Sequence, residues 1–185
     1  DIYTAKLCGE SSQLLWGTYI GGAGADHAFS VNADSNGCII IAGYTESTDI
    51  PVPGGYDRVF NGVRDIYLAK LNPSGNEMLW GTFIGGSSMD SGLDSAICQN
   101  DDIIITGWTY SWDIPVHGGW DPYYNGDADM YIARLSGTGS SLIWGTYIGG
   151  SGNDQGRSID IDKSGKIIIT GCTNSWDMPV PNAYD

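Results

Sequence analysis

Positively charged residues are scarce in this sequence. Its 185 residues include only 8 lysines and arginines against 22 aspartates and glutamates, which gives a net charge of −14 at neutral pH. Nucleic-acid binding requires a basic face that neutralises phosphates, and anionic membrane surfaces attract basic segments. The charge balance therefore disfavours both kinds of partner. It is compatible with a secreted protein, with cation binding, or simply with solubility.

Long apolar runs and helical patterns are also missing. No run approaches the roughly 18 residues of a membrane span, so we expect no membrane insertion. No segment of helical length carries an apolar stripe with a helical period. The sequence has no initiator methionine and no leader, and it begins inside a repeat, so we expect a processed or trimmed chain.

Histidine and cysteine offer little chemistry. The two histidines, His27 and His117, do not recur, and no serine-hydrolase, zinc-protease or phosphate-loop motif is present. No pair of carboxylates is singled out, so we expect no enzyme and keep a glycosidase or lyase as an outside alternative. The cysteines lack the spacing of zinc or haem sites, and free thiols or one or two disulfides remain open. They are Cys8, Cys38, Cys98 and Cys172.

What is present is a repeat. A stretch built on Trp-Gly-Thr recurs at residues 14–22, 78–86 and 142–150, so the step from each copy to the next is constant. A fixed period of this kind indicates a repeat architecture and outranks local propensity. The single domain, residues 1–185, divides without gaps into repeats 1–64, 65–128 and 129–185.

Each repeat contains four strand-like segments and one long connection. Alternating or continuously β-branched segments joined by Gly-containing turns predict an all-β protein. Four strands per repeat, with sheets buried on both faces, are typical of a β-propeller blade with four antiparallel strands. A β-helix would have shorter coils, and a β-sandwich need not repeat. The connection of roughly 20 residues is long, but its regular recurrence predicts an ordered loop.

The motifs of the repeat point to a known family. Every element is present in the first copy, at Trp16–Gly22, Asp26, Asp34–Gly37, Ile39–Thr45 and Ser47–Pro51. This pattern resembles the bacterial "seven-bladed beta-propeller" (SBBP) repeat over almost the whole chain. The second copy departs from it, because residues 98–101 replace the Asp-x-x-Gly turn. The resemblance implies a propeller, usually secreted or at the cell surface, and implies no activity.

By analogy with other propellers, the inner strand of a blade follows the Gly-Gly turn. The chain then holds three blade-equivalents: two complete blades at residues 26–86 and 90–150, an outer half at 1–22 and an inner half at 154–173. Three are too few for a ring, which needs roughly 4 to 8 blades. The two halves would also leave unpaired sheet edges.

We therefore expect a homo-oligomer in which the outer half of one chain completes the inner half of another. Two chains would close a six-bladed ring with two-fold symmetry, and a rotation that does not close would give a head-to-tail filament. A fragment of a longer propeller is the third alternative.

Three aspartates at equivalent positions are candidate ligand-binding residues: Asp26, Asp90 and Asp154. They fall in the links between an outer strand and the next inner strand, which would line one mouth of the channel. A ring of carboxylates there would bind a cation or a polar ligand. The alternative, which we favour, is that each carboxylate caps the turn after Gly-Gly through backbone N–H groups.

Two hairpin turns resemble the start of a calcium loop, with oxygen-bearing side chains at alternate positions. These candidate ligands are Asn32, Asp34 and Asn36 in the first copy and Asp160, Asp162 and Ser164 in the third. The later acidic ligand is missing, since Ile40 and Ile168 stand in its place. We expect no cofactor other than this Ca²⁺ alternative and favour an ordinary hairpin turn.

Tryptophans provide the remaining candidates. Trp112 and Trp176 occupy equivalent places in the long loop, with Trp108 near the first, and exposed indoles there would stack on sugars or anchor a protein. They would otherwise pin the loop to the blade. The Trp-Gly-Thr tryptophans are predicted to pack between blades. The sequence thus predicts a non-catalytic, secreted or surface propeller for assembly or binding, with a lectin-like propeller as the alternative.

Overall fold

The computed structural model describes residues 1–181, in which the regular elements are β-strands and no helix occurs. The strands of the first half are β1 (Ile2–Leu7), β2 (Leu14–Ile20), β3 (Asp26–Ala33), β4 (Ile39–Thr45), β5 (Asp65–Leu71) and β6 (Met78–Ile84). Those of the second half are β7 (Asp90–Ile97), β8 (Ile103–Thr109), β9 (Asp129–Leu135), β10 (Leu142–Ile148), β11 (Asp154–Ile161) and β12 (Ile167–Thr173).

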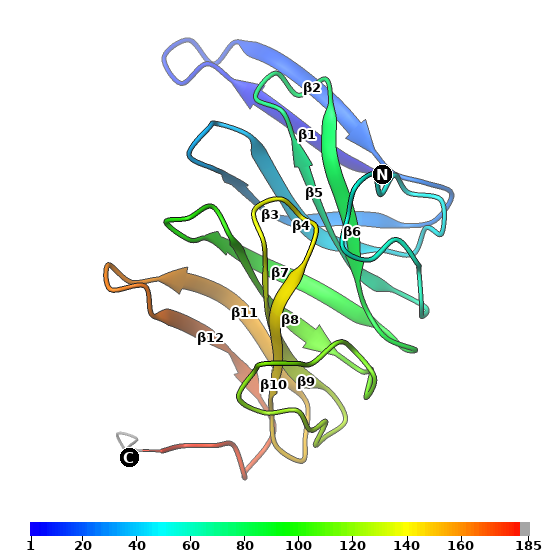
Figure 1. Ribbon diagram of the computed structural model, residues 1–185, viewed down its shortest axis with the longest axis vertical. Helices are drawn as coiled ribbons and strands as arrows, with labels where there is room; N and C mark the ends of the chain where they lie inside the picture. The colour runs from blue at the N-terminus through cyan, green and yellow to red at the C-terminus, as the bar shows by residue number, and fades with distance from the viewer. Residues whose placement is uncertain (182–185) are drawn as a thin grey trace.

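The strands form four antiparallel sheets that follow one another in chain order. Two sheets have four strands, β3-β4-β5-β6 and β7-β8-β9-β10, and two have only two strands, β1-β2 and β11-β12. Figure 1 shows them stacked from the blue β1-β2 sheet to the orange and red β11-β12 sheet. The predicted all-β fold is confirmed, with two complete four-stranded blades and two half-blades. We call β3–β6 blade 1 and β7–β10 blade 2.

Neighbouring blades share a core because each outer strand has two apolar faces. In β5 and β6, Ile66, Leu68 and Ile84 join a cluster with residues of blade 2, whereas Tyr67 and Phe83 join a cluster with β1 and β2. Successive side chains on a strand point to opposite faces, so an outer pair of strands packs in both directions at once. This alternation holds the stack of sheets together.

The tryptophans of the first two Trp-Gly-Thr strands pack against the turn of the following blade. Trp80 is 4% exposed, and its indole lies against Gly139 in the turn of blade 2. Gly139 has a φ of +70°, and a Cβ on it would overlap the indole, so glycine is required on both counts. Trp16 meets Gly75 of blade 1 in the same way. The predicted packing between blades is therefore present.

The long connection is an ordered part of each blade. Ile50 and Ile114 from the two complete connections are buried in the inter-blade clusters. The hydroxyls of Tyr67 and Tyr131 donate to the carbonyl oxygens of Pro51 and Pro115, at 2.7 and 2.6 Å. These contacts fix the loop to its blade, as its recurrence predicted.

Candidate functional site

The three repeated aspartates lie at the starts of β3, β7 and β11, and all are buried. Asp26 accepts hydrogen bonds from the Gly22 N–H at 2.9 Å and from the Ser47 hydroxyl at 3.1 Å. The first bond closes the turn after Gly-Gly, and the second ties that turn to the start of the long loop. Asp90 and Asp154 repeat these bonds with Gly86 and Ser111 and with Gly150 and Ser175. This geometry matches turn capping, and ligand binding at these residues stays a prediction.

A second set of aspartates is buried beside the first. Asp65 and Asp129 open β5 and β9 and are 0% exposed. One carboxylate oxygen of each accepts a backbone N–H, from Asn61 at 3.0 Å and from Asn125 at 2.9 Å, and the other oxygen has no hydrogen-bond partner among residues 1–181. These residues were not among the candidates predicted from the sequence. The signal was the recurrence of Asp as the first residue of every repeat.

The environment of Asp65 makes ionisation costly. Burial raises its pKa to about 7, and the neighbouring Asp90 and Asp57 carboxylates add to the effect. Burial likewise raises the pKa of Asp129 to about 6, with a further contribution from Asp154. Two carboxylates in one dry region disfavour each other's charge. These carboxyl groups can therefore hold protons near neutral pH. Both are buried at the first positions of β5 and β9, where solvent does not reach them.

The calcium-like turns are hairpin turns whose aspartates bond to the backbone. Asp34 accepts the N–H groups of Asn36 and Cys38, both at 2.9 Å, and its other oxygen pairs with Lys70 at 2.7 Å. Burial alone would raise the pKa of Asp34, but these partners outweigh it and lower the pKa. Asp162 accepts the N–H groups of Ser164 and Lys166 in the equivalent turn.

Of the other predicted calcium ligands, Ser164 donates its hydroxyl to Asp162 within the turn, at 2.7 Å, and two point elsewhere. Asn32 donates to the Ser95 carbonyl on the neighbouring inner strand, at 2.7 Å. Asp160 accepts the N–H of Ile161. Within the part of the chain that the structure describes, no group of three or more His, Cys, Asp or Glu side chains could hold a metal ion. The four cysteines are free thiols.

The predicted aromatic residues differ in exposure. Trp112 is 73% exposed and Trp176 is 90% exposed, whereas Trp108 is half-buried and packs edge-on against Tyr110. The aspartate after each exposed tryptophan, Asp113 or Asp177, accepts a backbone N–H from the residue after the preceding Gly-Gly turn. The aspartates thus pin the loops, and the indoles are left available to solvent.

The half-blade β1-β2 exposes large apolar side chains that are buried in a complete blade. Tyr3, Leu7, Leu14 and Tyr19 on β1 and β2 are each more than half exposed. Their counterparts in blade 2, at the same positions two repeats later, are no more than 5% exposed: Tyr131, Leu135, Leu142 and Tyr147. The same side-chain positions are therefore core in a complete blade and surface in the half-blade.

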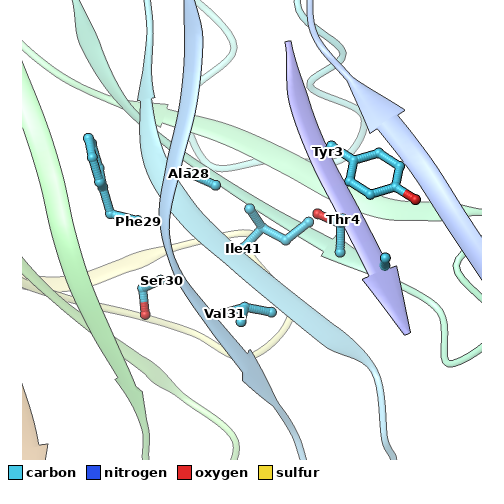
Figure 2. Close-up of a pocket in the computed structure, with 8 residues that line it drawn as sticks. Tyr3, Thr4, Ala28, Phe29, Ser30, Val31 and Ile41 are labelled. Carbon is cyan, nitrogen blue, oxygen red and sulfur yellow. The ribbon is translucent and has the colours of Figure 1, made fainter. Parts of the chain in front are cut away.

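Each half-blade also borders an open groove. A groove of about 240 Å³ lies between β1 and the inner strands of blade 1, lined by Tyr3, Thr4, Phe29 and Ile41 among others (Figure 2). A second groove, of about 220 Å³, lies beside β12 on the outer side of blade 2. It is lined by Ile132, Trp144, Thr146, Ile148, Ile167 and Ile169.

Comparison with known proteins gives one distant relationship. The chain is 27% identical over 197 residues to an uncharacterized WD repeat-containing protein of Acanthamoeba polyphaga mimivirus. The match covers 92% of this chain and 14% of the length of that protein. No family model matches the chain. Together with the repeated four-stranded sheets, the relationship indicates a repeat of the β-propeller type. Within residues 1–181, no helix is long and apolar enough to cross a membrane.

Proposed function

We propose that the chain is a non-catalytic propeller module of the SBBP type, secreted or at the cell surface, that assembles by completing its half-blades with those of a second copy. The observation that carries the proposal is the match between the two half-blades. β11-β12 has the strands of an inner half, and β1-β2 has those of an outer half. The WD repeat relative supports a binding or scaffold role over catalysis.

The complete blades give the register in which the half-blades of two copies would pair. In blade 1, β4 pairs with β5 so that Ile41 lies opposite Ala69, and in blade 2 Ile105 lies opposite Ala133. The equivalent residues of the half-blades are Ile169 on β12 and Ala5 on β1. In the composite blade, β12 of one copy therefore pairs antiparallel with β1 of the next. This pairing removes both unpaired edges, which otherwise template aggregation.

Burial of apolar side chains supplies the driving force. In the composite blade, Tyr3, Leu7 and Tyr19 enter the surroundings that hold Tyr131, Leu135 and Tyr147 in blade 2, next to the groove beside β12. Burying a large apolar side chain contributes on the order of 1.5–3 kcal/mol. Several such residues per joint offset the entropy of association.

The molar mass in solution tests the assembly. We expect a species of twice the 19.7 kDa chain mass if the ring closes, and a continuous rise of mass with concentration if a filament forms. The variant Tyr19→Asp places a charge on a side chain that is 72% exposed in the single chain and buried in the joint. It should fold with an unchanged circular-dichroism spectrum and sediment as a single chain.

The matched control is Tyr123→Asp, because Tyr123 is 71% exposed in the loop between β8 and β9 and belongs to neither half-blade. This variant should keep the wild-type mass. A folded wild-type protein that sediments as a single chain at all concentrations would refute the assembly.

A lectin-like function is the second candidate, carried by the exposure of Trp112 and Trp176. Indole faces stack on the apolar faces of sugar rings, and the two residues occupy equivalent places on successive loops. Binding to a glycan array should then fall at least tenfold in the double variant Trp112→Ala/Trp176→Ala. Trp120→Ala is the control, since Trp120 is also exposed but stands at a repeat position where the first and third copies have Tyr instead of Trp. Equal loss in both variants would contradict specific binding at the repeated indoles.

A further inference from the structure

An ion pair joins the inner and outer halves of each complete blade. In blade 1, the Lys70 ammonium on β5 lies 2.7 Å from Oδ2 of Asp34 in the β3–β4 turn. In blade 2, the Arg134 guanidinium on β9 lies 2.7 Å from Oδ2 of Asp102, just before β8. The cation holds the same repeat position in both, opposite Ile40 or Ile104 in the strand register. The pair therefore marks the seam between a β4-type and a β5-type strand.

The pair in blade 1 also reaches the next blade. Lys70 donates to the carbonyl oxygen of Gly137 in the turn of blade 2, at 3.1 Å, so one ammonium contacts both blades. Asp34 and Lys70 are both buried, and the Asp34 carboxylate is held in place by two backbone N–H groups. A fixed, poorly solvated carboxylate of this kind selects strongly for a cation opposite it.

The half-blades carry the two members of this pair on separate sheets. Asp162 stands in the turn of β11-β12 at the position of Asp34, with its Oδ1 accepting two backbone N–H groups in the same way. Lys6 stands on β1 at the position of Lys70. Within residues 1–181, neither side chain forms an ion pair.

We propose that Asp162 of one copy and Lys6 of a second copy form the ion pair that latches the composite blade. This inference rests on the proposed assembly and adds the contact that fixes its register. Pairing β12 with β1 places Lys6 opposite Ile168, as Lys70 lies opposite Ile40. A shift by one residue would put the lysine on the other face of the sheet, away from the carboxylate.

The hairpin that carries Asp162 also contains two lysines, Lys163 and Lys166. Lys166 stands at the repeat position of Asp102, so in the composite blade its ammonium lies near that of Lys6. Asp162 is then the carboxylate that separates two cations. Its removal leaves like charges facing each other across the joint, which makes the carboxylate more important there than in an isolated pair.

Charge reversal tests the latch, with the dissociation constant of the assembly measured by sedimentation equilibrium. Asp162→Lys should weaken assembly by about tenfold or more, because the ammonium groups of Lys6 and Lys166 then face a third cation in place of the carboxylate, beside Lys163. Adding Lys6→Asp to that variant should restore most of the affinity. Asp127→Lys is the control: it changes the net charge equally, is exposed before β9 at the opposite end of that strand from Arg134, and should leave the dissociation constant within about twofold.

The outcomes separate the two proposals. If the wild-type chain assembles but Lys6→Asp fails to rescue Asp162→Lys, the latch is wrong and the blade-completing assembly stands. If the wild-type chain does not assemble, the proposed function itself fails. Rescue in the double variant, with the control unchanged, supports both.

Discussion

At the scale of single residues, the most unusual groups are the buried carboxyls at the starts of β5 and β9. Asp65 has one oxygen without a hydrogen-bond partner in the described residues and a pKa raised by burial to about 7. The folded-state pKa lies above the ordinary value of 3.8, so the protonated form is the one that the fold favours. Stability from this group is complete below about pH 3.8 and is lost as the pH rises through about 7.

The variant Asp65→Asn should therefore become more stable than the wild type as the pH rises. Asn resembles the protonated acid and can still accept the Asn61 N–H. We expect no difference in the free energy of unfolding near pH 3, and a gain of about 4 kcal/mol for the variant at pH 8, measured by urea denaturation. Asp127→Asn, at an exposed position, should show no such gain. A gain that does not depend on pH would contradict the account.

At the scale of elements, the turn of one blade supports the tryptophan of the blade before it. Gly139 needs a positive φ and also needs to lack a Cβ, because its Cα lies against the Trp80 indole. Gly165 occupies a turn with a φ of +82° but has nothing within 4 Å of its Cβ position. The two glycines therefore separate the backbone cost of a substitution from its packing cost.

Replacement of each glycine by alanine should reveal that difference. Gly165→Ala should cost about 1 kcal/mol for the left-handed backbone alone. Gly139→Ala should cost about 1–3 kcal/mol more, because the new methyl group displaces the indole from the inter-blade core. Urea denaturation with Trp fluorescence measures both. Equal losses in the two variants would show that the contact between turn and indole adds no stability.

At the scale of the whole molecule, the repeat made the architecture predictable. The constant period, the apolar strands and the Gly-containing turns led to four strands per blade, because each is a local rule that recurs in every repeat. Turn capping by Asp26 and its counterparts was the alternative that the sequence favoured, since recurrence in every blade is typical of structural residues.

Other features could not be read from the sequence because they depend on contacts between distant segments. The difference between a buried Tyr131 and an exposed Tyr3 arises from the neighbouring sheet, not from the strand itself. The pairing of Lys70 with Asp34 likewise needs the strand register, which brings two residues far apart in the chain to one seam. Trp108 belongs to the same class, since its half-buried position depends on Tyr110 and the blade around it.

The shared two-faced packing of the outer strands also bears on how such chains change in length. Every boundary between blades uses the same positions of the repeat. If one whole period were duplicated or deleted, the blades that became neighbours would bury the same repeat positions as the existing boundaries. No new set of inter-blade contacts would have to arise. The number of blades in such chains is then free to vary by genetic duplication, while the chemistry of each boundary stays constant.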